Sequence, residues 1–459
     1  MENRLIVILG SVGALLLGTT ILLSGQGLFL ILVPTKLGQQ GFAPSWISGV
    51  ATAYFAGYTL GAWFGGRIIR RVGHIRVYGG LLALAIASAL ALPLEADVTG
   101  WLALRFLYGA SIAGVYLVIE SWLNAVIPNK WRGRVLSIYT ALSLGALGAG
   151  QLLINVYPTE GKDLFLLGGI VLAISIVPVV LSRVTAPEIA VFSHFSLPSL
   201  FRLSPFGIVS SVSAGLMTGA FWALTPLFGV ARELSTSEIA LLMAFPVFGG
   251  LFLQLGIGYL SDRMDRRTAL LAAATGALLA ALAIVFLGGI SLTFLLSAMT
   301  LFGGMTFALY PLALSHAVDQ LAEGENVLPI SAGLLIANGA GMAVGPLIAG
   351  QFFDHLGANG LIIFFALTAG WIISYTLWRI SRHGPVPEAA RSYFVPVGDM
   401  TTMGVELDPR IDPEMLAEES EEIIEPGGAG AGSTAREDEA GPPENDTPHV
   451  WSEDRDGPR

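Results

Sequence analysis

The chain alternates between long uncharged apolar runs and short segments that carry most of its charge. A membrane-spanning helix needs about 20 predominantly apolar residues, and twelve runs approach or exceed that length. They lie near residues 5–33, 45–66, 77–94, 100–124, 135–156, 164–182, 206–230, 239–260, 269–288, 291–318, 329–352 and 360–378. The pattern predicts an all-α membrane protein with twelve transmembrane helices.

Composition supports this prediction and narrows the chemistry. Apolar residues make up 54% of the chain, charged residues 13%, and the mean hydropathy is +0.69, which lies outside the range of soluble domains. The absence of cysteine excludes disulfides and thiolate metal sites. No phosphate-binding GxxxxGK[ST] loop, metal-ligand cluster or nucleophile–base spacing occurs. We therefore expect no enzyme, no cofactor, no bound metal and no nucleic-acid partner; the lipid bilayer is the expected surrounding.

Lys and Arg residues are distributed unequally between alternate loops. With the N-terminus inside, the outer loops hold only Lys36, Lys162 and Arg232, whereas the inner segments hold sixteen basic residues. The sixteen are Arg4, Arg67, Arg70, Arg71, Arg76, Lys130, Arg132, Arg134, Arg183, Arg202, Arg263, Arg266, Arg267, Arg379, Arg382 and Arg391. Cytoplasmic loops carry such an excess, so both termini are expected in the cytoplasm, with the protein in the plasma (inner) membrane.

The net charge of −10 comes from the C-terminal end of the chain. Residues 401–459 contain 17 Asp or Glu and four Arg, a net charge of −13, which leaves +3 for residues 1–400. The segment 383–459 is rich in Gly, Pro and acidic residues and has no apolar period, so we expect an acidic disordered cytoplasmic tail. The tail is either a solvated segment without a specific partner or a regulatory segment that docks on the basic inner loops.

The twelve runs divide into two related halves. A proline-containing loop from Arg183 to Pro205 separates six runs from six. The predicted domains are an N-terminal six-helix bundle at 1–184, a cytoplasmic linker at 185–204 and a C-terminal six-helix bundle at 205–382. The segment GASIAGVY at 109–116 matches GGMTFALY at 303–310 at an offset of 194. Such internal repeats are typical of transporters, whose substrate site lies near the midplane between the repeats.

The sequence GYLSDRMDRR at 258–267 stands between two apolar runs. It resembles the loop between the second and third helices of a half-domain in the major facilitator superfamily. Residues Gly258, Asp262, Arg263, Arg266 and Arg267 match that signature, Asp265 replaces its second glycine, and Gly66 corresponds to Gly258 at an offset of 192.

Other stretches resemble the YcaD-type branch of that superfamily. They are RFLYGASIAGVYLVIESWLN at 105–124, RGR at 132–134, GQLL at 150–153 and LYP at 309–311. The resemblance covers everything except the tail, and it implies the major facilitator fold of two pseudosymmetric bundles. It also implies a secondary transporter that moves a small molecule by alternating access, with the substrate left open.

Four ionisable residues lie inside predicted spans: Arg105, Glu120, His316 and Asp319. A charge in hydrocarbon costs at least about 2.5 kcal/mol, so each is a candidate functional residue. All four fall on the fourth or tenth helix, and the resemblance implies that these helices line the central cavity. Arg105 with Gly109 also resembles a motif linked to proton coupling. The alternative is an arginine near a helix end whose side chain extends to the surface.

Glu120 is the candidate proton-binding group. Tyr116, Glu120 and Asn124 are spaced by four and form one polar stripe on a helix, which suits a cavity wall. The alternative places Glu120 at the membrane interface. Protons are thus the expected coupling ion, and the small-molecule substrate is unknown.

His316 and Asp319 are three residues apart and share a helix face. They could relay protons. The family resemblance instead implies that Asp319 joins Asp262 and Arg266 in a cytoplasmic latch. At the matching first-half positions, Arg70 and His74, no carboxylate occurs, so we expect an altered first-half gate that includes Gly66, Arg70 and Arg71.

Further residues that could contact a substrate are polar or aromatic groups inside other spans: Gln26, Trp222, Thr225 and Tyr310. The predicted function is a proton-coupled secondary transporter. The alternative is a transporter-like membrane sensor or assembly partner that signals through its acidic C-terminal tail.

Overall fold

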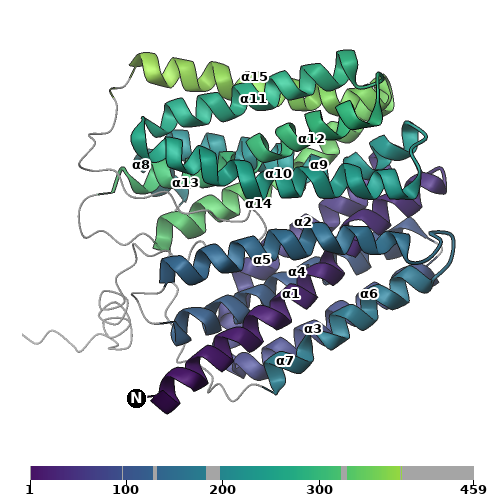
Figure 1. The fold of residues 1–459 in the computed structure, drawn as a ribbon, viewed down its shortest axis with the longest axis vertical. Helices are drawn as coiled ribbons and strands as arrows, with labels where there is room; N and C mark the ends of the chain where they lie inside the picture. The colour runs from purple at the N-terminus through teal and green to yellow at the C-terminus, as the bar shows by residue number, and fades with distance from the viewer. Residues whose placement is uncertain are drawn as a thin grey trace, which may run out of the picture.

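The computed structural model describes residues 2–95, 97–127, 132–181, 197–321, 328–382 and 384. Within them the regular structure is helical, and the helices form two stacked bundles (Figure 1). The helices from α1 to α7 make up one bundle, and those from α9 to α15 make up the other. The predicted linker 185–204 lies partly outside the described residues, and the tail 383–459 does so except for Gly384.

The α-helices begin and end as follows: α1 Glu2–Gln39, α2 Pro44–Val72, α3 His74–Ala91, α4 Val98–Val126, α5 Arg132–Leu152, α6 Asp163–Ile174, α7 Ile176–Val180, α8 Leu197–Leu203, α9 Pro205–Ala231, α10 Thr236–Arg263, α11 Arg266–Leu287, α12 Leu292–Thr306, α13 Leu309–Val318, α14 Leu328–Leu356 and α15 Ala358–Arg382. Two short 3₁₀ helices, η1 Leu92–Leu94 and η3 Leu153–Asn155, follow α3 and α5.

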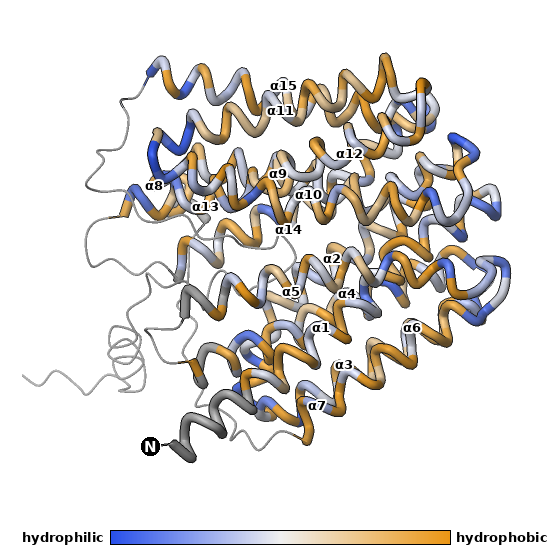
Figure 2. Tube along the Cα trace, viewed as in Figure 1, coloured by the Kyte–Doolittle hydropathy of each residue, from blue (hydrophilic) through white to orange (hydrophobic). Residues whose placement is uncertain are grey.

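Local sequence signals set several helix starts. Ser235 and Glu238 form a capping box at the start of α10, in which each side chain bonds the other residue's backbone. Ser291 caps α12 by accepting from the Phe294 amide. Pro44 and Pro205 occupy the first positions of α2 and α9, where a missing N–H costs nothing. Figure 2 shows the result, with apolar residues along the helices and hydrophilic residues gathered at their ends.

Eleven helical segments of the described chain are long and apolar enough to cross a membrane. The helix at the second predicted run, α2, is not among the eleven, so the count of twelve stays a prediction. Two predicted spans are broken: Ser175 separates α6 from α7, and a turn at 307–308 separates α12 from α13. Helix α2 contains several Tyr, Thr and Ser residues, and it packs against α4 of its own half and α14 of the other. Ser48, Tyr54 and Tyr58 of this helix are thus buried against protein.

Within each half, glycines let neighbouring helices pack closely, and they do so at corresponding positions in the two halves. A Cβ on Gly57 of α2 would collide with the carbonyl oxygen of Phe106 on α4, and one on Gly249 of α10 would collide with that of Thr300 on α12. The offsets are 192 and 194, the values seen in the sequence repeat. Matching contacts also join Gly109 with Tyr54 and Gly303 with Pro246, Gly27 with Leu147 and Gly219 with Met342, and Gly150 with Ser24 and Gly345 with Leu216. Small residues let membrane helices approach closely, so the pseudosymmetry resides in the backbone packing.

The halves meet mainly at the end that holds Gln39, Pro44, Asn155 and Ser235, which the charge distribution predicts to face outward. We call it the predicted outer end; the opposite end is the predicted inner end. Hydrogen bonds between the halves include Thr52 Oγ1 to the Ala343 carbonyl at 2.8 Å and Ser237 Oγ to Asn155 Oδ1 at 2.9 Å. These bonds join α2 to α14 and α10 to η3.

Within the first half, a buried lysine ties a helix to a loop at the same end. Lys36 Nζ donates to the carbonyl oxygens of Thr159, Glu160 and Gly161 at 3.0–3.1 Å. The ammonium group has three donors, so these carbonyls account for all of them.

Candidate functional site

Arg105 lies inside the protein on α4 and is 3% exposed, so its side chain does not extend to the surface. Its guanidinium carbon is 4.5 Å from the ring centre of Tyr54 and 5.4 Å from that of Tyr108. These are cation–π distances. Gln26 of α1 links the two phenols: its Nε2 donates to Tyr54 Oη and its Oε1 accepts from Tyr108 Oη, both at 2.6 Å.

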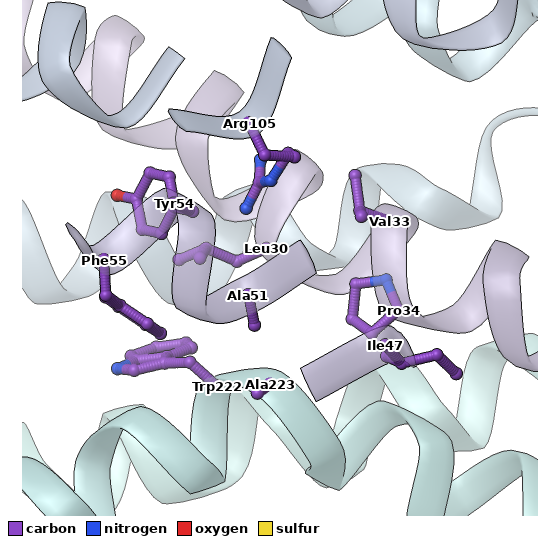
Figure 3. Close-up of a pocket in the computed structure, with 10 residues that line it drawn as sticks. All are labelled: Leu30, Val33, Pro34, Ile47, Ala51, Tyr54, Phe55, Arg105, Trp222 and Ala223. Carbon is purple, nitrogen blue, oxygen red and sulfur yellow. The ribbon is translucent and has the colours of Figure 1, made fainter. Parts of the chain in front are cut away.

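A cavity between the halves begins at this network (Figure 3). In this conformation it is narrow, with about 10 Å³ available to the centre of a water-sized sphere, which is room for about one water molecule. Arg105 points into it from one side, and Trp222 of α9 lies across from it. The lining residues are Leu30, Val33, Pro34, Ile47, Ala51, Tyr54, Phe55, Arg105, Trp222 and Ala223. The lining is therefore mostly apolar, and Figure 3 shows the Tyr54 hydroxyl and the Trp222 nitrogen at its Phe55 side.

A second cavity lies between α2 and α14. It is also narrow, with about 20 Å³ available to the centre of a water-sized sphere, and is lined by Phe55, Tyr58, Thr59, Ala62, Leu335, Ile336, Gly339 and Met342. Phe55 lines both cavities, so the two are neighbours. Both cavities are bounded by residues of the two halves, as expected for a site between repeats.

Glu120 is fully buried and belongs to a different group of side chains on α4. Tyr139 Oη of α5 donates to Glu120 Oε1 at 3.2 Å. The Tyr116 hydroxyl is buried without a hydrogen-bond partner, and its ring centre is 6.1 Å from that of Tyr58. Glu120 therefore does not sit at an exposed helix end. The side chain of Asn124, the third member of the expected stripe, lies outside the described residues.

Arg105 and Glu120 do not pair with each other. They are fifteen residues apart on one helix, which corresponds to about 22 Å at 1.5 Å per residue. Tyrosines fill the interval, because Tyr54 has ring contacts of about 6 Å with both Tyr108 and Tyr58. A substrate at Arg105 and a proton at Glu120 would occupy separate places along α4.

At the predicted inner end of the second half, Arg266 of α11 binds two carboxylates. Its Nη1 donates to Asp262 Oδ1 at 2.8 Å and its Nε donates to Asp319 Oδ2 at 3.0 Å. Nη1 also donates to Ser261 Oγ at 2.7 Å. The three residues expected in a latch thus lie together and connect α10, α11 and the end of α13. Gly258 is buried one turn earlier on α10, and the exposed Arg263 stacks on Tyr259 with its guanidinium 4.0 Å from the ring centre.

Aspartate can replace the glycine of the loop signature at position 265 because the backbone there does not adopt the left-handed conformation that favours glycine. Its φ is −60°, and its side chain caps α11 by accepting from the Arg267 amide at 2.9 Å. The carboxylate also binds the Arg267 guanidinium, with Nη2 and Oδ2 2.6 Å apart. Burial alone would raise the pKa of Asp265, but the hydrogen bonds and charge of Arg267 outweigh it and hold the pKa below its usual value.

The first half has a different arrangement at the equivalent place. Gly73, at the position of Asp265, has a φ of +91°, which favours glycine. His74, at the position of Arg266, contacts α4 through a 2.9 Å hydrogen bond between its Nε2 and Ser121 Oγ. Gly66 is buried, whereas Arg70 and Arg71 are exposed on the last turn of α2. A neutral hydrogen bond thus replaces the ion pair of the second half.

The other predicted residues are divided between these places. His316 lies near the predicted inner end, edge-on to Phe206 with ring centres 4.7 Å apart, and its Nε2 is 3.0 Å from Gln320 Nε2. Asp265, Arg267, Asp319 and Arg379 are its charged neighbours. The structure therefore places His316 beside the second-half cluster rather than on the two cavities. Tyr310 is buried at the start of α13 and lines neither of them.

Sequence reasoning named Tyr116 but missed the other four tyrosines around Arg105 and Glu120. Five of the chain's 11 tyrosines gather here: Tyr54, Tyr58, Tyr108, Tyr116 and Tyr139. A signal was present, since Tyr54 and Tyr58 are four residues apart on the span that faces Arg105, and Tyr108 follows Arg105 by one turn. These tyrosines form one site because α2 packs against α4, a contact that the spacing alone does not show.

Comparison with known proteins identifies relatives over most of the chain. A family model described as Major Facilitator Superfamily matches residues 15–333. The chain is 27% identical over 381 residues to an uncharacterized MFS-type transporter, YcaD, of Escherichia fergusonii, a match that covers 82% of this chain and 97% of the relative. YcaD of an Escherichia coli strain is likewise 27% identical over 378 residues, with the same shares covered.

Solved structures share the fold at low sequence identity. The nucleoside transporter NupG superposes with a TM-score of 0.68 at 11% identity, over 81% of this chain and 98% of that one. The human organic anion transporter MFSD10 gives 0.58 at 17% identity, over 81% and 99%. The Escherichia coli fucose:proton symporter FucP gives 0.54 at 18% identity, over 80% and 98%.

Proposed function

The chain belongs to the Major Facilitator Superfamily and is a multi-pass membrane transporter rather than an enzyme, and from that premise we propose that it carries a small molecule by proton-coupled alternating access. The transporters with this fold act on compounds as different as nucleosides, an organic anion and fucose by their names. The fold alone does not choose among such compounds, so the proposal rests on this chain's own cavities.

The observation that carries the proposal is the position of Arg105, buried on a cavity that residues of both halves enclose. The contacts between the halves concentrate at the predicted outer end, through Thr52 and Ala343 and through Asn155 and Ser237. This supports a conformation closed on the predicted outer side. Rocking of one half against the other would break these contacts and open the cavities on that side.

Proton coupling is assigned to Glu120. It is the acidic side chain on the cavity-lining helix α4, it is buried, and Tyr139 donates a hydrogen bond to it. A carboxyl group in such a place can bind a proton on one side of the membrane and release it on the other. The proposal extends to orientation: we place the protein in the plasma (inner) membrane with both termini in the cytoplasm.

Residues Asp262, Arg266 and Asp319 are proposed as the second-half gate on the cytoplasmic side. The cluster connects α10, α11 and α13 at the predicted inner end. Exposed Arg70 and Arg71, with His74 bound to Ser121, are proposed as a weaker first-half counterpart.

Spin-label distances test alternating access without knowledge of the substrate. The chain contains no cysteine, so labelled pairs can be introduced directly, one at the predicted outer end (Gln40→Cys with Ala231→Cys) and one at the predicted inner end (Val72→Cys with Thr268→Cys). In the reconstituted protein we expect two populations in which one distance lengthens as the other shortens. Distances that change together, or never change, contradict alternating access.

The same labels test the coupling residue. Lowering the pH should shift the populations of the unsubstituted chain, and Glu120→Gln should remove that response, because glutamine cannot bind or release the proton. Glu95→Gln, which changes an exposed carboxylate, is the matched control. A pH response that survives in Glu120→Gln would contradict the assignment. Comparing metabolites between cells that lack and cells that overproduce the protein would then supply candidate substrates for flux measurements.

A further inference from the structure

We infer that the transported compound is an organic anion with a flat apolar body, such as an aromatic carboxylate, and that its anionic group binds Arg105. The inference rests on the proposed function and names the substrate class of the same site. It follows from three features of the cavity: an uncompensated cation, unused hydrogen-bond donors and aromatic walls.

The charge of Arg105 is not balanced by the residues that the structure describes. The titratable groups that interact with its guanidinium are the phenols of Tyr54 and Tyr108, and a phenol is neutral at physiological pH because its ordinary pKa is about 10. The acid on the same helix, Glu120, is about four turns away. A buried cation without a counter-ion is costly, whereas a paired one is tolerated. The site is therefore incomplete without an anion.

Donor groups at the cavity also lack partners. Arg105 Nε and Nη1 are buried without a hydrogen bond, and so is Trp222 Nε1 on the opposite half. An unsatisfied buried donor costs about 1–3 kcal/mol, so a ligand that accepts from these groups recovers this cost. Guanidinium groups bind carboxylates well because their planar donors match the two oxygens. Trp222 supplies a further donor from the second half.

The remaining walls select the body of the compound. Tyr54, Phe55 and Trp222 present rings to the cavity, and the other lining residues are aliphatic. Trp222 is held in place by stacking on Phe307, with ring centres 5.9 Å apart and planes 21° apart. Such walls favour a planar apolar group and offer little to a sugar, whose hydroxyls would lack partners.

The second half has no equivalent of this cation. At the repeat offset of 194, the position of Arg105 is occupied by Met299, a buried apolar residue. The cavity therefore accommodates one anionic group, held by the first half, while the second half contributes the ring of Trp222.

Binding of a charged compound and its neutral analogue to the full chain in nanodiscs tests the inference. Benzoate and benzamide have the same shape, and benzoate is ionised near neutral pH. We expect the unsubstituted protein to bind benzoate roughly tenfold or more tightly than benzamide, as expected for charge-assisted hydrogen bonds. Arg105→Gln should bring the two affinities together. Arg67→Gln, which removes an exposed arginine of the neighbouring helix α2, should leave the preference intact.

Arg105→Lys and Trp222→Phe guard against a variant that fails to fold. The lysine keeps the charge but loses the planar donors, so the preference for benzoate should shrink without disappearing. The phenylalanine keeps the ring and loses the N–H, so the affinity for benzoate should fall by a smaller factor than in Arg105→Gln. Equal binding of the two compounds by the unsubstituted chain, no binding of benzoate, or an undiminished preference in Arg105→Gln would overturn the inference.

This result is independent of the proposed transport. If benzoate fails to bind while the spin-label distances alternate, the anion inference falls and the carrier stands. If benzoate binds through Arg105 and the distances do not alternate, the carrier falls and the anion site stands.

Discussion

Arg266 Nε donates to Asp319 Oδ2 at 3.0 Å, and the Asp319 side chain has no exposed surface. The second partner of Arg266, Asp262, is 31% exposed. The two ion pairs share one cation but differ in their solvent environment, and this difference leads to a prediction about their energies.

We expect Asp319→Asn to destabilise the protein far more than Asp262→Asn. Breaking a fully buried pair costs about 3–5 kcal/mol, whereas a partly exposed pair is worth about 0–1 kcal/mol. Chemical unfolding of the purified protein in detergent measures both. Arg263→Gln, a substitution of an exposed neighbour, serves as the control with little effect. Equal losses for the two aspartate variants would show that burial does not set the strength of this cluster.

The ion pair of the second-half gate can be introduced at the equivalent positions of the first half. The double substitution Arg70→Asp with His74→Arg places opposite charges four residues apart, as in the pair of Asp262 and Arg266. Because Arg70 is exposed, the new pair should contribute less than about 1 kcal/mol, and because His74 is buried and bonded to Ser121, its replacement should offset that contribution. The populations reported by the spin labels at Val72→Cys and Thr268→Cys should nevertheless shift if the unequal gates bias the transporter. Populations identical to those of the unsubstituted chain would contradict a gating role for this region.

Replacing either of two corresponding packing glycines, one in each half, should destabilise the protein. Gly57→Ala and Gly249→Ala each place a methyl group against a carbonyl oxygen of the neighbouring helix, and overpacking of this kind costs about 1–3 kcal/mol. Gly145 has no atom within 4 Å of its Cβ position, so Gly145→Ala should be neutral or should stabilise α5 by up to about 1 kcal/mol. Thermal unfolding compares the three. A neutral Gly57→Ala would mean that α2 and α4 can separate without loss.

Asp265 should contribute stability that depends on pH. Its pKa is lowered in the folded protein from a usual value of 3.8, so the contribution is fully present above about pH 3.8 and is lost as the pH falls through the lower folded value. The stability difference between the unsubstituted chain and Asp265→Asn should therefore be constant from about pH 5 to pH 8 and shrink in stronger acid. A difference that grows toward acidic pH would contradict the ion pair with Arg267.

Hydrophobic periodicity is sufficient to predict the helices, because a span must satisfy its own backbone hydrogen bonds within lipid. The repeat offsets read from GASIAGVY and GGMTFALY recur in the packing of Gly57 on Phe106 and Gly249 on Thr300. The breaks at Ser175 and at residues 307–308 were not predicted, although each lies three to four residues before a proline, Pro178 or Pro311, which cannot donate a hydrogen bond to the preceding turn.

The sequence drew attention to the charged members of the site and to a few polar or aromatic ones, Gln26, Tyr116 and Trp222. Arg105 and Glu120 stand out because charge is rare in apolar runs. Tyrosine is not rare there, and whether Tyr54 faces lipid or Arg105 depends on how α2 is rotated against α4. That rotation follows from glycines such as Gly57 and Gly109, whose contacts are between helices distant in sequence. His316 and Glu120 lie apart because they belong to helices of different halves, and the sequence alone does not show how those helices are placed.

The bonds that join the halves differ in kind from those inside each half. Lys36 saturates three carbonyls within the first half, and Arg266 binds two carboxylates within the second. Across the boundary, hydroxyls such as those of Thr52 and Ser237 make single neutral bonds, each worth about 0.5–1.5 kcal/mol. The polar contacts inside each bundle are thus charged or multiple, and those across the boundary are neutral and single. The proposed rocking of the halves would break only contacts of the second kind.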